Sequence, residues 1–92
     1  LRGSMEDILE SALSDDQQEE ILSIASEVNG INEPHNLRTR KIGNIIAIDL
    51  HVRVHPEMIV REAHNRASEI ERKLRDRLGA ETFISIHIEP IK

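Results

Sequence analysis

The C-terminal stretch of the chain alternates apolar and polar side chains, which is typical of a half-buried strand. Ile84, Ile86 and Ile88 occupy alternate positions, so they share one face of such a strand. His87 and Glu89 then share the other face. The pattern predicts a strand that packs its isoleucines against a core and presents an imidazole beside a carboxylate.

A second alternating stretch, residues 45–54, repeats this arrangement. Its polar positions include Asp49, His51 and Arg53. Its apolar positions are Ile46, Ile48, Leu50, Val52 and Val54. Two such strands predict a sheet with one apolar face under helices and one face that bears possible ligands.

A strand over residues 31–42 is predicted to form a hairpin with this second strand. The turn between them is Gly43-Asn44, and glycine in its first position suits a type II′ turn. Counting back from the turn pairs Arg38 with Asp49, a favourable cross-strand pair of opposite charge.

The orientation of His35 depends on how regular this first strand is. Strict counting from the turn sets His35 opposite Val52, on the face that the helices are expected to cover. His35 joins the polar face only if the strand begins after it or if a β-bulge intervenes. The sequence leaves both possibilities open.

Two amphipathic helices are predicted to cover the apolar face. Ser14 and Gln17 have the spacing of a capping box at the start of the first helix, and Asn29-Gly30 is expected to end it. The second helix starts near residue 60 and ends at Gly79. The order helix, strand, strand, helix, strand predicts an α+β fold with both helices on one face of a three-stranded sheet.

The length of 92 residues fits one domain. Residues 1–4, ahead of Met5, look like an expression scar. Helical spacing predicts a lead-in helix or connector over residues 5–13. Residues 14–92 are expected to form the domain itself.

The composition argues against several classes of function. There is no cysteine, which removes thiolate metal sites and thiol catalysis. Phe83 is the single aromatic residue and the formal net charge is −5, so we expect no nucleic-acid partner. No run of about 18 apolar residues is present, so the chain as given is not expected to span a membrane.

The polar face of the predicted sheet is a candidate metal site. His51 and His87 point away from the apolar face, and Asp49 and Glu89 point with them. Imidazole and carboxylate groups held side by side on strands suit zinc. The chain has no HExxH motif, and Ser85 with His87 lacks a third, orienting group, so we expect no enzyme.

Four segments of the chain follow one another in a familiar order and spacing over roughly residues 14–91. They are His35-Asn36-Leu37-Arg38-Thr39-Arg40-Lys41-Ile42-Gly43-Asn44, Asp49-Leu50-His51-Val52, Glu62-Ala63-His64 and Ile86-His87-Ile88-Glu89-Pro90. Together they resemble the cytosolic C-terminal domain of cation diffusion facilitator (cation efflux) transporters. This resemblance implies a metallochaperone-like, ferredoxin-like α+β domain that pairs with itself.

The resemblance also implies a site for Zn²⁺ or another divalent transition metal. Its implied ligands are His35, His51, His64, His87 and Glu89, where Glu89 stands in place of the Asp found in zinc-transporting members. The implied role is that of a cytoplasmic domain of a membrane protein. Ions bound there would stabilise one dimer arrangement and so bias the membrane domain of the same transporter.

A homodimer is also expected from the residues alone. The core of so short a chain is small. In a monomer, Ile45 and Ala47 on the face without helices would be exposed to water. The alternative to a metal-binding domain is an α+β dimer module that senses a small organic ligand. Such a module needs a glycine-containing binding loop, whereas Gly43 lies in a tight hairpin. A ferredoxin-like nucleic-acid-binding domain and a metallohydrolase are weaker alternatives.

Overall fold

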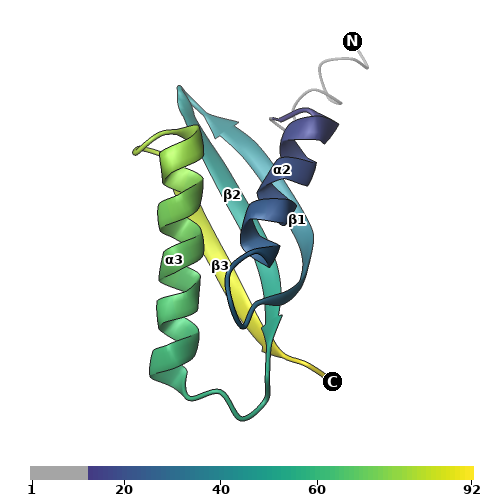
Figure 1. Ribbon diagram of the computed structural model, residues 1–92. Coiled ribbons are helices and arrows are strands. Elements are labelled where there is room, and N and C mark those ends of the chain that lie inside the picture. Colours follow the sequence, from purple (N-terminus) through teal and green to yellow (C-terminus); the bar gives the residue numbers. More distant parts are fainter. Residues whose placement is uncertain (1–12) are drawn as a thin grey trace.

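The computed structural model describes residues 13–92, and its elements follow the predicted order (Figure 1). They are α2 (Asp15–Ser26), β1 (Asn32–Ile42), β2 (Ile45–Val54), α3 (Val60–Leu78) and β3 (Phe83–Pro90). The predicted lead-in helix over residues 5–13 lies outside the described residues, apart from Leu13, which packs into the core. The α+β fold class is confirmed.

The sheet has the strand order β1-β2-β3, and both helices cover one of its faces (Figure 1). β1 and β2 are antiparallel and form the hairpin. β2 and β3 are parallel, and α3 makes the crossover between them. β2 is therefore the central strand, and no element of residues 13–92 covers the face opposite the helices, which is called the open face below. Within residues 13–92, no helix is long and apolar enough to cross a membrane.

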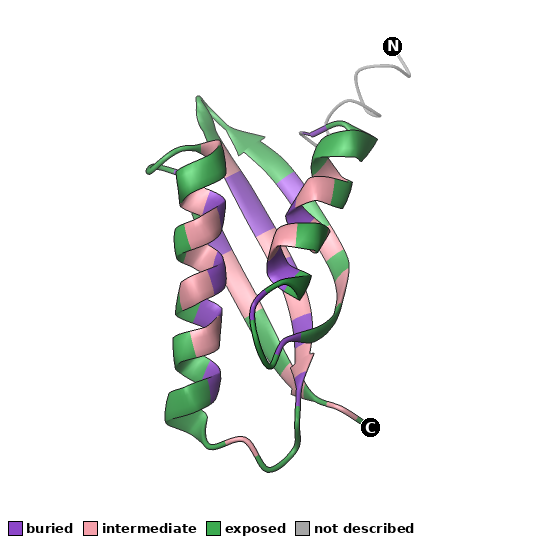
Figure 2. Ribbon diagram, viewed as in Figure 1, coloured by how far each residue is buried: buried purple, intermediate pink, exposed green. Residues whose placement is uncertain are grey.

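The core lies between β2 and the two helices (Figure 2). Ile48, Leu50 and Val52 of β2 and Ile70 and Leu74 of α3 are each no more than 1% exposed. Burying an aliphatic side chain of this size contributes about 1.5–3 kcal/mol. Because side chains alternate along β2, this burial directs the polar residues between them onto the open face.

The boundaries of α2 follow the predicted capping box but not the predicted stop. The hydroxyl of Ser14 accepts a hydrogen bond from the backbone N–H of Gln17 at 3.2 Å, and the Gln17 side chain accepts from the Ser14 N–H at 3.1 Å. The helix ends before Asn29-Gly30, so the predicted stop is too late. Gly30 (φ 87°) instead turns the chain toward β1, and Val28 enters the core from this turn at 2% exposure.

The hairpin has the predicted turn and register. Gly43 has φ 61°, the value that a type II′ turn requires of its first residue. Arg38 lies opposite Asp49, as counting from the turn predicts.

The register then shifts on both sides of His35, which lies opposite His51 and not opposite Val52. Strict counting is therefore wrong at this position, and the alternative of a bulge is correct. Glu33 (φ 49°) and Asn36 (φ 55°) adopt the left-handed conformation on either side of His35. The bulge turns the His35 side chain onto the open face.

The open face has an apolar end near the hairpin. Ile42, Ile45 and Phe83 are 56%, 38% and 62% exposed there. Ala47 is only 4% exposed, so the expectation that it would be exposed to water is wrong. Arg40 and Phe83 lie opposite Ala47 on the two neighbouring strands.

Candidate metal centre

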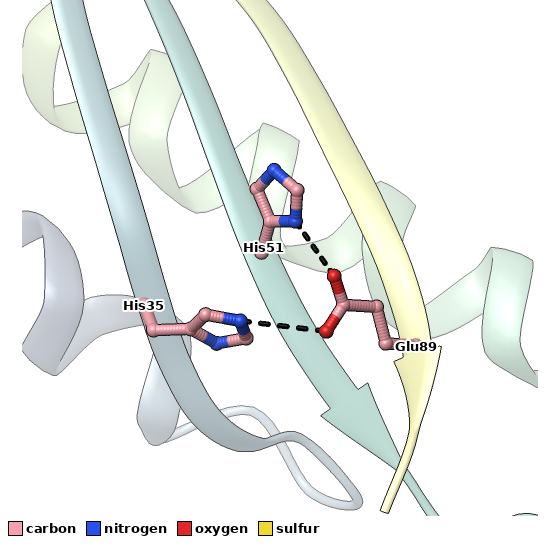
Figure 3. Close-up of side chains that lie close together, drawn as sticks. All are labelled: His35, His51 and Glu89. Carbon is pink, nitrogen blue, oxygen red and sulfur yellow. Dashed lines mark hydrogen bonds and ion pairs between the residues drawn. The ribbon is translucent and has the colours of Figure 1, made fainter.

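Three side chains from three strands meet on the open face, and Figure 3 shows them pointing toward one another. They are His35 of β1, His51 of β2 and Glu89 of β3, and all three are half-buried. One possible ligand atom from each lies within 4.8 Å of the others. The cluster joins the two strands of the hairpin to the parallel strand that follows α3.

The backbone fixes which nitrogen of His35 faces the cluster. Its Nδ1 lies 2.7 Å from the backbone carbonyl oxygen of Glu33. A carbonyl oxygen only accepts, so Nδ1 carries a proton, and in the neutral ring Nε2 keeps its lone pair. Nε2 lies 3.4 Å from Oε1 of Glu89. A backbone partner on one nitrogen that leaves the other free is the usual arrangement of a metal-binding histidine.

His51 and Glu89 are directly hydrogen-bonded. His51 Nδ1 lies 2.8 Å from Oε2 of Glu89. This hydrogen bond is the main reason that the pKa of the Glu89 carboxyl lies below its ordinary value of 4.5. Burial opposes the shift, and the charges of His35, His51 and Arg53 each add to it. Glu89 is therefore an ionised acceptor at neutral pH, which is the form that binds a cation.

The three donors fit a divalent transition metal. Tetrahedral zinc has bonds of about 2.0–2.1 Å to nitrogen and oxygen, which sets its ligand atoms roughly 3.3 Å apart. The 3.4 Å separation of His35 and Glu89 already matches that spacing. The 2.8 Å separation of His51 and Glu89 is a hydrogen bond that an ion would replace. Two imidazoles and one carboxylate leave further coordination positions open.

His87 lies next to this cluster but pairs elsewhere. Its Nε2 lies 2.7 Å from Oδ1 of Asp49, and the ring stacks on that of His51 with centroids 4.5 Å apart and planes 13° from parallel. An imidazole binds a metal in its own ring plane, and one ion cannot lie in both of two stacked planes. In this arrangement His87 therefore does not share an ion with His51.

Asp49 is the partner that the sequence interpretation did not assign to His87. The two residues are on adjacent strands with their side chains on one face, and the register makes them diagonal neighbours, because Asp49 lies opposite Ser85 and His87 lies opposite His51. The hydroxyl of Ser85 also approaches Nε2 of His87, at 3.5 Å. Because Asp49 and Ser85 meet the same nitrogen, the three do not form a nucleophile–base–acid relay.

His64 is not brought into the cluster. It is exposed on α3, which covers the opposite face of the sheet. His64 lines an apolar groove of about 350 Å³ together with His55 and Glu89. His55 lies in the turn after β2, where its Nδ1 accepts from the Glu57 N–H at 3.1 Å.

Curated relatives match most of this chain but are much longer. A cation-efflux pump FieF from Yersinia enterocolitica is 38% identical over 84 residues, which are 90% of this chain and 27% of that protein. FieF from Yersinia pestis (strain Pestoides F) is 34% identical over 88 residues, 95% of this chain and 29% of that protein. The chain thus spans less than a third of the length of these relatives.

Solved structures of transporter domains share the fold. A structure of the transporter CzrB has a TM-score of 0.78 at 30% identity, covering 88% of this chain and all of that one. The C-terminal domain of CzcD from Thermotoga maritima has a TM-score of 0.72 at 22% identity over 85% of this chain and 94% of that one, which shows the fold. The family described as "Cation efflux protein, cytoplasmic domain" matches residues 13–91. The chain belongs to this family of cytoplasmic domains of cation efflux proteins.

Proposed function

We propose that this domain binds zinc, or another divalent transition metal, on its open sheet face. The observation that carries the proposal is the convergence of His35, His51 and Glu89 within 4.8 Å. The resemblance implies two further ligands. His87 lies next to the cluster, and His64 lines the neighbouring groove with Glu89. The proposal is supported by CzrB, which has been solved in a zinc form and has a TM-score of 0.77 at 29% identity, covering 88% of this chain and 92% of that one.

The second part of the proposal is that two copies pair. The exposed side chains of Ile42, Ile45 and Phe83 lie at one end of the face that carries the ligand cluster. A second copy would remove this apolar surface from water, and a two-fold axis would use the same surface on both chains. The short chain, with its modest core, favours such pairing.

The third part is regulatory. Ions on this face favour one arrangement of the two copies, and that arrangement biases the membrane domain of the same transporter. The relatives named as cation-efflux pumps support this role, and this chain matches 27% and 29% of the length of two of them. By linkage, the ion must bind the favoured arrangement more tightly than the other.

A calorimetric titration of dialysed protein with zinc, manganese and cobalt tests the metal site. We expect saturable binding, and the His51→Ala variant should bind zinc about 100-fold more weakly, because a four-ligand zinc site of about 10–16 kcal/mol loses roughly 3 kcal/mol with one donor. His55→Ala is the matched control, because His55 lies outside the cluster. Equal losses in the two variants, or no binding by the unaltered protein, would contradict the proposal.

Sedimentation at micromolar concentrations tests the pairing. We expect mass to rise with concentration, more steeply with zinc present, and Phe83→Asp to shift the equilibrium toward the monomer. A monomer at every concentration, with and without zinc, would contradict this part of the proposal.

A further inference from the structure

Arg53 lies beside the candidate centre and is not itself one of the candidate ligands. It follows His51 by two residues on the open face of β2 and lies opposite Glu89 of β3 in the register. Its Nη1 donates to Oε1 of Glu33 at 2.7 Å. Its Nε lies 3.6 Å from Oε1 of Glu89. The guanidinium thus bridges two carboxylates on the two neighbouring strands.

The Nε–H of Arg53 is an unused donor. The atom is buried and has no hydrogen-bond partner among residues 13–92. A separation of 3.6 Å to the Glu89 oxygen is too long for a hydrogen bond, and a shift of a few tenths of an ångström would close it. Leaving a buried donor without an acceptor costs free energy, so the structure favours a state in which Glu89 moves toward Arg53.

Glu33 extends this contact to His35. Its carboxylate holds Arg53, and its backbone carbonyl accepts from Nδ1 of His35. Glu33 also has φ 49°, so its conformation is part of the bulge that turns His35 onto the open face. Fixing the Glu33 side chain therefore helps to hold the carbonyl that selects the tautomer of His35.

We propose that Arg53 is a positioning residue of the metal centre, which donates its Nε–H to Glu89 when that carboxylate binds an ion and holds Glu33 so that His35 presents Nε2. This inference rests on the proposed function. Ligands of bound metals are ordinarily held by such outer hydrogen bonds, whose loss weakens binding about 10- to 100-fold.

The positive charge of Arg53 should weaken metal binding, because a cation near the site repels a metal ion. The hydrogen bonds of its guanidinium should strengthen metal binding. Arg53→Lys separates the two effects. Lysine keeps the positive charge but lacks the planar fork that reaches two carboxylates at once. A loss of affinity in this variant therefore reports geometry and not charge.

The experiment is a zinc titration of the unaltered protein, Arg53→Lys and a matched control, Arg66→Lys. Arg66 on α3 also has a buried Nε without a partner among the described residues, and it pairs with Glu62 and Glu69 away from the centre. We expect Arg53→Lys to bind zinc about tenfold more weakly and Arg66→Lys to bind as the unaltered protein does. Equal affinities for all three proteins would overturn the inference and leave the proposed function standing.

Nitrogen NMR of the metal-free protein measures the tautomer of His35, which a general loss of stability would not change. In the unaltered protein we expect the proton of His35 on Nδ1, and in Arg53→Lys and Glu33→Gln a mixture of tautomers. The losses of zinc affinity in these two variants should also not add fully, because both disturb the same contact between Arg53 and Glu33. An unchanged tautomer in both variants would overturn the link to His35. A flat titration of the unaltered protein would instead refute the proposed function, and this inference with it.

Discussion

Asn36 is the position at which a single substitution tests how the bulge of β1 supports the site. Its φ of 55° is left-handed, and Asn accepts this conformation more readily than most residues. Asn36→Val should disfavour the bulge, because a β-branched side chain is poorly tolerated there. A straightened strand would return His35 to the position opposite Val52, under the helices.

The size of the effect follows from the backbone. Placing an ordinary residue in the left-handed region costs roughly 1–2 kcal/mol, and the free energy of unfolding should fall by about that amount if the bulge persists. In a domain of this size, each 1 kcal/mol lowers the melting temperature by about 4–8 °C. If the strand straightens instead, zinc affinity should fall as in a variant that lacks the imidazole. Thermal melting with and without zinc measures both quantities.

Asn36→Gly is the matched control. Glycine adopts the left-handed conformation without steric cost, so the bulge and the zinc affinity should be retained, with a stability change below about 1 kcal/mol from the freer unfolded chain. If Asn36→Val melted and bound zinc as the unaltered protein does, the bulge would not depend on this backbone conformation and the reasoning would be refuted.

Further predictions concern stability and pH. Ser14→Ala should lower the free energy of unfolding by about 1 kcal/mol in urea titration, because the cap of α2 is lost. Leu50→Ala should lower it by about 2–5 kcal/mol, because Leu50 is 0% exposed in the core. In metal-free protein, the folded state lowers the pKa of Glu89, so its contribution to stability is present above pH 4.5 and is lost as the pH falls below that value. The stability difference between the unaltered protein and Glu89→Gln should therefore shrink in acid unfolding curves below pH 4.5. The zinc-induced rise in melting temperature should fade between about pH 7.5 and 5, because protons compete for imidazoles that ordinarily titrate near 6.5. A rise that stays constant over this range would exclude histidine ligands.

The fold could be predicted because local signals agreed with the burial pattern. Ser14 begins a helix, Gly43 supplies a turn and Gly79 ends a helix, and each signal is a backbone requirement that only a few residue types satisfy. The end of α2 was predicted too late because Asn29-Gly30 can close either a helix or a turn. Tertiary packing of Val28, which no local signal records, favoured the turn.

The candidate site could be predicted only in part. The alternation of side chains along a strand shows which face of the sheet a residue lies on, but not which residues are its neighbours there. His51, His87 and Glu89 were placed on the open face by alternation alone. The same rule failed for His35, because the bulge depends on left-handed residues that carry no glycine signal. Nor could alternation show that Asp49 takes His87 away from the cluster, because strand pairing brings both acids within reach of the histidines.

The location of the cluster decides what an ion bound there can do. An ion between the helices and the sheet would mainly stabilise the fold of one chain, as structural zinc does. His35, His51 and Glu89 instead lie on the face that the helices leave open, on the same strands as Phe83 and Ile45. In the proposed homodimer, a copy that covers the apolar end also limits the space over the ligands. Ion occupancy and the arrangement of the two copies are then linked, and each must change the equilibrium of the other by the same factor.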